Sequence, residues 1–258
     1  MSDPVPDTRA PASRRERLRS QTIRELKEAS FAEVRERGAV GLSLRSVARR
    51  LGMSPAGLYR YVDSREQLLT LLIADGYHDL ADHLLVALGA PPAERTAGDG
   101  ADPQVPVIAG PEQDVAARLS AVALAYRAWS VAHPNVFGLL FGDPIPGYQA
   151  PPGGPTVEAM NRVGRALAQP LIEAWHQGRL RTHPALDAEE LAAPLAPMVP
   201  ATADLPTDVL AQLLLSWGRL HGQVSLEVFG HHHWLLPDGC EALFRADVEV
   251  MLSDLGVR

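Results

Sequence analysis

Residues 43–65, SLRSVARRLGMSPAGLYRYVDSR, carry the start and stop signals of two short helices joined by a tight turn. Ser43 precedes a run with apolar residues at helical spacing, where a serine side chain accepts hydrogen bonds from the free N–H groups of the first turn. Gly52 ends that helix because glycine tolerates the left-handed backbone that a helix C-terminus often needs. Ser54 and Pro55 then begin a second helix at the positions these residues favour. The stretch predicts a helix-turn-helix.

The second helix of this unit has an apolar side and an outward side. Leu58 and Val62 lie four residues apart and are expected to face the core. Small residues on the other side allow close approach to base edges, while Arg60 and two tyrosine hydroxyls can donate to phosphate or base acceptors. Ser64 caps the next helix and places Arg65 in its first turn, near a phosphate. The predicted DNA-binding residues are Ser43, Arg45, Ser54, Pro55, Ala56, Gly57, Tyr59, Arg60, Tyr61 and Arg65.

The charge of the chain is unevenly distributed. The 258 residues carry a net charge of −7, yet residues 1–70 hold 14 Arg and Lys against 9 Asp and Glu, so this part carries +5 and the rest −12. Five arginines face one acid, Asp63, over residues 43–65, which suits a phosphate backbone. An isolated run of arginines is more often a solvated helix face, but the surrounding motif favours DNA. At the start of the first helix, the four arginines within residues 14–19 can contact phosphate or a minor groove, or they can be solvated at the helix end. Both alternatives stay open.

Several matched segments give residues 14–88 a family resemblance. A long lead helix, a turn at Gly38, and the segments SLRSVARRLGMS, GLYRYV and SREQLL resemble the DNA-binding domain of the TetR family of bacterial regulators. The resemblance implies a homodimer whose recognition helices enter successive major grooves of a pseudo-palindromic operator, usually as a repressor that a small-molecule effector releases. Gly57 is a departure, since glycine weakens a helix by roughly 1 kcal/mol relative to alanine.

The whole chain is predicted to be all-α with two domains. A disordered leader (1–13) precedes the helix-turn-helix domain (14–63), and a long helix near 65–88 leads into a ligand-binding and dimerisation domain (64–258) that contains a flexible loop (89–111). Residues 135–141 are predicted to form a short turn, and residues 142–155 a loop that can fold over a cavity mouth. Further helices are expected at 112–133, 156–177, 188–198, 208–229 and 239–255.

The segment 208–229 is apolar around much of its circumference. Such a helix has to pack inside its own subunit and against a second one, which predicts a four-helix dimer interface. Its Trp217, His221 and Gly222 form a W-x-x-x-H-G pattern that resembles a C-terminal domain type of TetR-like regulators. Aromatic residues of this segment and of the helices expected at 112–133 and 156–177 are candidates for lining an effector cavity, or they pack the core. His221 can sense a ligand or satisfy a buried hydrogen bond. The candidate effector-binding residues are Tyr126, Trp129, His133, Trp175, Trp217 and His221.

Other classes of protein find little support. Cys240 is the single cysteine, which rules out an intrachain disulfide and fits a reducing cytoplasm. His231, His232 and His233 are consecutive, so a solvated loop is favoured over a metal site. No apolar run approaches the roughly 20 residues that span a bilayer, and no catalytic motif is present. We expect a cytoplasmic regulator without cofactor, metal or enzymatic activity. A helical protein-interaction module without DNA binding is the alternative, against which five arginines and an intact turn argue.

Overall fold

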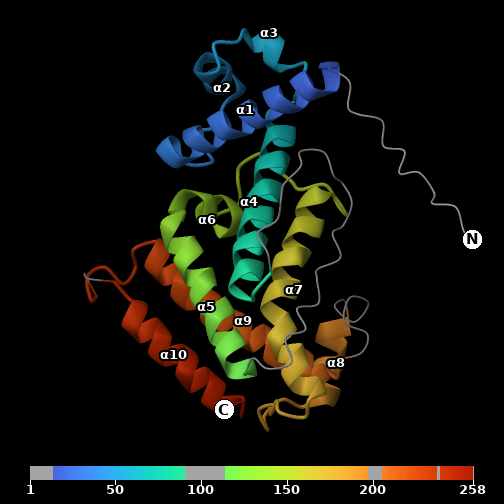
Figure 1. The fold of residues 1–258 in the computed structure, drawn as a ribbon, viewed down its shortest axis with the longest axis vertical. Coiled ribbons are helices and arrows are strands. Elements are labelled where there is room, and N and C mark those ends of the chain that lie inside the picture. Colours follow the sequence, from blue (N-terminus) through green and yellow to red (C-terminus); the bar gives the residue numbers. More distant parts are fainter. Residues whose placement is uncertain (1–13, 91–113, 197–204, 237–238, 258) are drawn as a thin grey trace, which may run out of the picture.

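The computed structural model describes residues 14–90, 114–196, 205–236 and 239–257. Within these ranges the chain forms ten helices and no strand, which confirms the all-α prediction (Figure 1). The predicted leader and nearly all of the predicted loop at 89–111 lie outside the described residues. The helices are α1 (Arg14–Arg37), α2 (Leu44–Arg50), α3 (Pro55–Leu58), α4 (Arg65–Ala87), α5 (Val115–Ala132), α6 (Pro134–Phe141), α7 (Pro155–His176), α8 (Ala188–Leu195), α9 (Thr207–Val228) and α10 (Glu241–Asp254).

Helix α4 connects the two parts of the molecule. In Figure 1, α1 lies across the upper end with α2 and α3 above it, and α4 descends from them among the C-terminal helices. It packs along α7 and also contacts α5, α6 and α1. Leucines recur at helical spacing along α4, and among them Leu68, Leu72, Leu80 and Leu84 are fully buried. Each such side chain contributes about 1.5–3 kcal/mol by leaving water, so one continuous core holds α4 along its length.

Residues 134–141 form helix α6, so the prediction of a turn at 135–141 was wrong. Pro134 occupies the first helical position, where its missing N–H costs nothing. Eight residues are too few for periodicity to distinguish a helix from an apolar turn, and the packing of Val136, Phe137 and Leu139 into the core decides the outcome. The following loop is anchored too, because the hydroxyl of Tyr148 lies 3.2 Å from that of Thr70 on α4.

Helix α6 contacts both α1 of the N-terminal part and α4, which leads into the C-terminal part. Gly76 lets α6 lie close to α4, since a Cβ at this position would stand 3.1 Å from Leu140 and 3.2 Å from Val136. The hydroxyl of Tyr77 donates to the carbonyl oxygen of Leu140 (3.0 Å). The side-chain amide of Asn135 donates to the backbone carbonyl of Arg35, near the end of α1. One short helix therefore contacts both α1 and α4.

Candidate functional site

The helix-turn-helix signals take the geometry that the sequence predicts. The hydroxyl oxygen of Ser43 accepts from the backbone N–H of Ser46 (3.2 Å), and that of Ser54 accepts from the N–H of Gly57 (3.1 Å). Gly52 has φ +64°, the left-handed conformation expected at the end of α2. Each cap satisfies an N–H that the helix itself leaves without a partner, so the turn between α2 and α3 is fixed by local bonds.

Helix α3 is a single turn that continues as a tighter one. After Leu58 the N–H of Tyr61 bonds to the carbonyl oxygen of Leu58 (2.9 Å), three residues back. Leu58 and Val62 are buried as predicted. Tyr61 is half-buried and packs against the core, whereas both tyrosines were expected to project outward or to flank the outward side. The tightened turn rotates Tyr61 toward the core. The exposed remainder, called the reading surface below, is Ser54, Pro55, Ala56, Tyr59 and Arg60.

The arginines of α2 differ in whether they pair with a carboxylate of the protein. Arg50 turns toward α1, where its guanidinium pairs with Glu33 (3.0 Å) and Glu36 (2.6 Å). Burial acts to raise the pKa of Glu33, but hydrogen bonds from Ser46 and Arg50 outweigh it, so the pKa is lowered and the pair stays ionised. Arg50 thus fastens α2 to α1. Three arginines of this region are exposed and meet no carboxylate among the described residues: Arg45, Arg49 and Arg60.

Arg65 is engaged inside the protein. Its Nε donates to the carbonyl oxygen of Leu42 (2.9 Å), and its Nη2 donates to those of Ala39 (3.2 Å) and Val40 (3.5 Å). Those carbonyls belong to the connection between α1 and α2, which contains few regular backbone bonds of its own. Arg65 therefore holds this connection against the start of α4, and its contact with a phosphate stays a prediction.

Three of the six candidate effector residues come together in the C-terminal part. The hydroxyl of Tyr126 lies 2.7 Å from Nδ1 of His221, whose Nε2 is 3.3 Å from the hydroxyl of Ser225. Trp217 stacks on the imidazole with ring centroids 4.8 Å apart. Burial lowers the pKa of His221 and raises that of Tyr126, so both groups are uncharged at neutral pH.

The other three candidates lie elsewhere, so the six do not line one site. Trp129 donates from its indole N–H to Asp79 on α4 (2.8 Å), and His133 packs beside it with ring centroids 5.0 Å apart. Trp175 contacts the ring of its neighbour His176 instead. Tyr126 and Trp129 share α5, but a separation of three residues, together with different neighbouring helices, directs them to different partners.

Residues that the sequence reading missed complete an aromatic cluster. Tyr77 from α4, Phe137 and Phe141 from α6, and Phe229 after α9 join the group. Phe141 lies 4.9 Å from the ring of His221, and Phe137 lies 5.7 Å from it. The four-residue spacing of the two phenylalanines indicates one face of a helix, a signal that the turn predicted for this segment does not use. The aromatic cluster comprises Tyr77, Tyr126, Phe137, Phe141, Trp217, His221 and Phe229.

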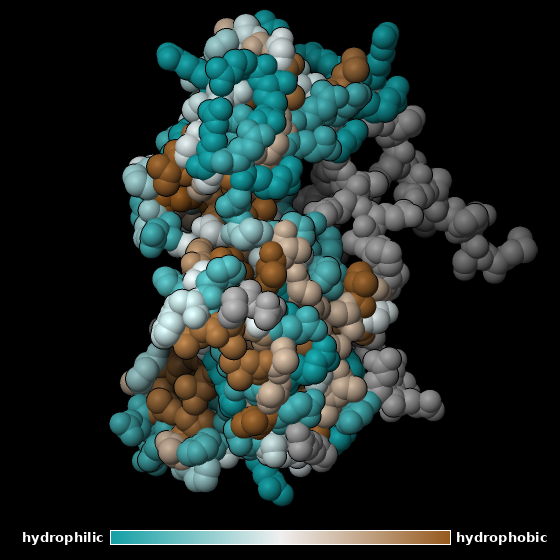
Figure 2. Space-filling model, turned by 90° about the vertical axis from the view of Figure 1, so that its left-hand side faces the viewer, coloured by the Kyte–Doolittle hydropathy of each residue, from teal (hydrophilic) through white to brown (hydrophobic). Residues whose placement is uncertain are grey.

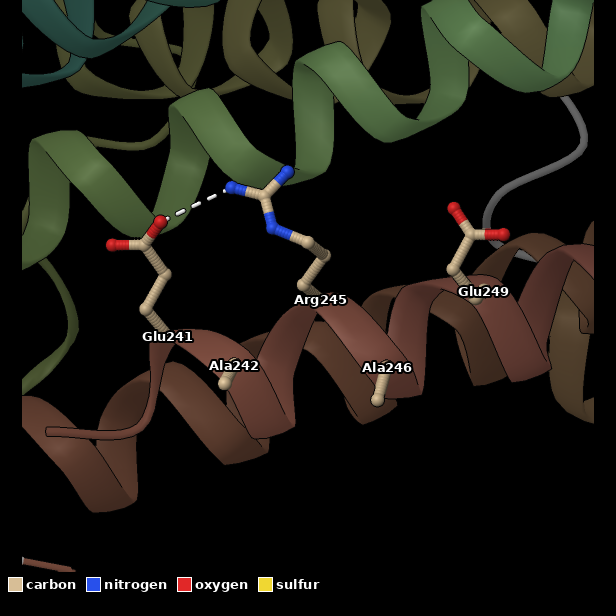
Figure 3. A pocket seen from close by; sticks show the side chains of 5 residues that line it. All are labelled: Glu241, Ala242, Arg245, Ala246 and Glu249. Atoms are coloured by element: carbon tan, nitrogen blue, oxygen red, sulfur yellow. Dashed lines mark hydrogen bonds and ion pairs between the residues drawn. The ribbon is translucent and has the colours of Figure 1, made fainter.

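A shallow hollow of about 500 Å³ lies on the outer face of α10, away from this cluster. Figure 3 shows Glu241 at one end joined to Arg245 in the middle, Glu249 at the other end, and the short side chains of Ala242 and Ala246 on either side of Arg245. Lined from a single helix, it cannot enclose a small molecule. Among the described residues no group of three His, Cys, Asp or Glu side chains is placed to hold a metal ion. Nor is any described helix long and apolar enough to cross a membrane.

Comparison with known proteins agrees with this architecture. Residues 26–80 match the family model described as bacterial regulatory proteins, tetR family, and residues 119–251 match the Tetracyclin repressor-like, C-terminal domain. The HTH-type transcriptional regulator Rv1816 of Mycobacterium tuberculosis is 32% identical over 221 residues, which are 85% of this chain and 86% of that protein.

Solved structures share the fold over nearly the whole chain. The crystal structure of regulatory protein SCO4313 superposes with a TM-score of 0.68 at 30% identity, covering 93% of this chain and all of that one. The transcriptional regulator FadR from Bacillus subtilis, solved with stearoyl-CoA, gives a TM-score of 0.55 at 13% identity and covers 90% of this chain and 99% of its own. With a capped helix-turn-helix, a matching C-terminal domain and a relative that matches 85% of the chain, the protein belongs to the TetR family and is a DNA-binding transcriptional regulator.

Proposed function

We propose that the protein is a cytoplasmic homodimeric repressor without catalytic activity, which binds a pseudo-palindromic operator and leaves it when a small molecule enters the C-terminal domain. The observation that carries this proposal is the reading surface. Its backbone is fixed by serine caps, Leu58 and Val62 anchor it, and Tyr59 and Arg60 stay exposed. A rigid, outward, cationic turn is what base and phosphate recognition in a major groove requires.

An uncharged face of α9 supports a homodimer. Leu214, Leu215, Leu226 and Phe229 are exposed on it, and Arg219 marks its edge by pairing with Asp247 of α10. Beside that ion pair, Leu243 and Val250 of α10 are exposed as well. Figure 2 shows hydrophobic surface around a hollow in the lower half of the molecule, whereas the upper end is mostly hydrophilic. A second copy that covers this face would remove the apolar surface from water.

Two glycines strengthen the case for close helix approach. A Cβ at Gly218 or Gly222 would meet nothing within 4 Å among the residues that the structure describes, so packing against them gives no reason for glycine there. Each glycine costs a helix interior roughly 1 kcal/mol relative to alanine. Contact between the α9 helices of two subunits would provide the reason, because small residues let helix backbones approach closely.

DNA recognition in this proposal uses both exposed and framework groups. The two α3 turns would enter successive major grooves about 34 Å apart. Arg60 and Tyr59 would contact base edges or phosphates, and Arg45 phosphates near the start of α2. Ser43 and Ser54 would contribute as caps beside the backbone, while Tyr61 and Arg65 would mainly hold the surface in place.

The aromatic cluster is the proposed sensor. It joins α9 to α6, and α6 contacts both α4 and α1, so an apolar or amphipathic ligand that separates these rings would displace the helix that carries the DNA-binding domain. A shift of α4 would move the two reading surfaces away from the spacing of a DNA turn. A coupling free energy of roughly 1–3 kcal/mol is enough for a useful switch.

A mobility shift tests the proposal. Wild-type protein is used to select duplexes from a random library at stated salt, and the selected duplex is titrated with wild type, Arg60→Ala and the control Arg35→Ala, an exposed arginine at the far end of α1. We expect a palindromic consensus, weaker binding by Arg60→Ala and wild-type binding by Arg35→Ala. Absence of any sequence-preferring complex at low salt would instead support the interaction-module alternative.

A further inference from the structure

A second cationic surface lies at the beginning of α1. Its first six residues, RRERLR, contain four arginines and one glutamate, and all six are exposed. Among the described residues no carboxylate pairs with Arg14, Arg15 or Arg19. These charges also stand at the positive end of the helix dipole, an arrangement that disfavours the helix. Glu16 is the one acid in this first turn, whereas two glutamates neutralise the single charge of Arg50.

The position of this surface points to the ligand. In Figure 1 the N-terminal end of α1 reaches the same end of the molecule as α2 and α3, while its C-terminal end lies lower, beside α6. The arginines at the beginning of α1 therefore lie at the same end of the molecule as the helix-turn-helix, which carries the exposed Arg45, Arg49 and Arg60. The C-terminal end of α1 carries Arg35 and Arg37, so both ends are basic, but in Figure 1 only the N-terminal end rises toward the level of α2 and α3.

We infer that Arg14, Arg15 and Arg19 bind backbone phosphates of DNA beside the groove that α3 enters. Guanidinium groups pair with phosphate oxygens in bidentate fashion, and the N-terminus of a helix itself attracts anions. A phosphate would thus relieve the unfavourable placement of these arginines. The contacts carry no base information, so they raise affinity and salt dependence but leave sequence preference unchanged. The inference rests on the proposed function, since it places the same DNA on a wider surface.

The experiment compares two charge-matched double variants of the same helix. Arg14→Gln/Arg15→Gln removes two charges at the upper end, and Arg35→Gln/Arg37→Gln removes two at the other. The probe is the duplex selected by wild-type protein, and its Kd is measured by fluorescence anisotropy over a KCl series. Each lost phosphate contact lowers the slope of log K against log salt by about 0.9, so two arginines in each of two subunits predict a slope shallower by up to roughly 3.6.

The control variant should keep the wild-type slope, and both variants should keep the wild-type ratio of affinities for selected and scrambled duplexes. In an ethylation-interference assay, fewer phosphates should be required for binding by Arg14→Gln/Arg15→Gln than by wild type, and the control variant should require the same phosphates as wild type. Arg14→Lys/Arg15→Lys retains the charges and should retain the slope. The first variant should melt no lower than wild type, because it removes charges that oppose the helix dipole. If it fails to fold, the single variant Arg19→Gln is measured in its place, with a slope shallower by up to roughly 1.8.

Two failures are distinguishable. Wild-type protein that selects no duplex would overturn the proposed function and this inference with it. Selection by wild type, together with equal slopes and equal ethylation patterns for wild type and the Arg14/Arg15 variant, would overturn the inference alone. In that case the arginines form a solvated helix end.

Discussion

Arg127 offers the sharpest test of how the C-terminal domain holds together. This α5 residue is 9% exposed, and its Nε and Nη2 donate to both carboxylate oxygens of Glu227 on α9 (2.8 and 2.6 Å). Its Nη1 reaches Glu241 at the start of α10 (3.4 Å). One guanidinium therefore joins three helices. Arg127→Met would leave the carboxylate of Glu227 largely buried, with the backbone N–H of Cys240 as its remaining described donor.

Breaking a buried ion pair from one side costs about 3–5 kcal/mol, because the remaining charge has lost its hydration without compensation. For a chain of this size 1 kcal/mol shifts the melting temperature by about 2–4 °C, so Arg127→Met is expected to melt about 6–20 °C lower. The matched control is Arg245→Met, whose partner Glu241 sits one turn away. Both side chains are more than half exposed, and such a pair contributes about 0.3–0.5 kcal/mol, or at most about 2 °C.

Melting is followed by circular dichroism at neutral pH and equal protomer concentration, since dimerisation shifts apparent stability. The double variant Arg127→Met/Glu227→Met should recover most of the loss, because an apolar pair replaces a buried ionic one at little cost. The reasoning is refuted if Arg127→Met melts within 2 °C of Arg245→Met. It is equally refuted if the double variant is no more stable than the single one, since the loss would then not come from the stranded carboxylate.

Three further outcomes are expected. Leu215→Glu places a charge on the exposed face of α9 and should convert the dimer to monomer in sedimentation velocity; a dimer of wild-type affinity would remove α9 from the interface. Wild-type stability should fall as pH drops from about 6.5, because burial lowers the pKa of His221 and the unfolded chain then binds the proton more tightly. His221→Gln should make that fall shallower between pH 7.5 and 5.5, and an unchanged slope would contradict this. Gly164→Ala meets open space and should gain roughly 1 kcal/mol of helix stability, whereas Gly76→Ala meets α6 side chains and should gain less, so equal melting temperatures would argue against close packing there.

Much of the DNA-binding domain was predictable because its signals act over a few residues. Ser43 and Ser54 cap helices through bonds to residues three positions away, and Gly52 adopts the left-handed conformation that its place requires. The helix at 65–87 was equally clear, since a leucine stripe over more than six turns leaves little alternative. Where the apolar segment was short, as at Pro134–Phe141, the same reasoning failed.

The candidate effector site was less predictable than the fold. Tyr126, Trp217 and His221 do meet, but Trp129, His133 and Trp175 have other partners, and Phe137 and Phe141 were not anticipated. Aromatic residues at helical spacing predict that these side chains are buried. Only the orientation of the neighbouring helices determines which residues they contact.

The sequence by itself determined the helix-turn-helix, the helical class and the family, because caps, glycine conformations and helical periodicity depend on neighbours along the chain. The tertiary structure alone decided that Arg50 and Arg65 fasten the DNA-binding domain together while Arg45 and Arg60 remain exposed. It also decided which rings form the aromatic cluster. An arginine has the same charge and reach in either role, and its partners are set by groups from 14 to 26 residues away that only folding brings within hydrogen-bond distance.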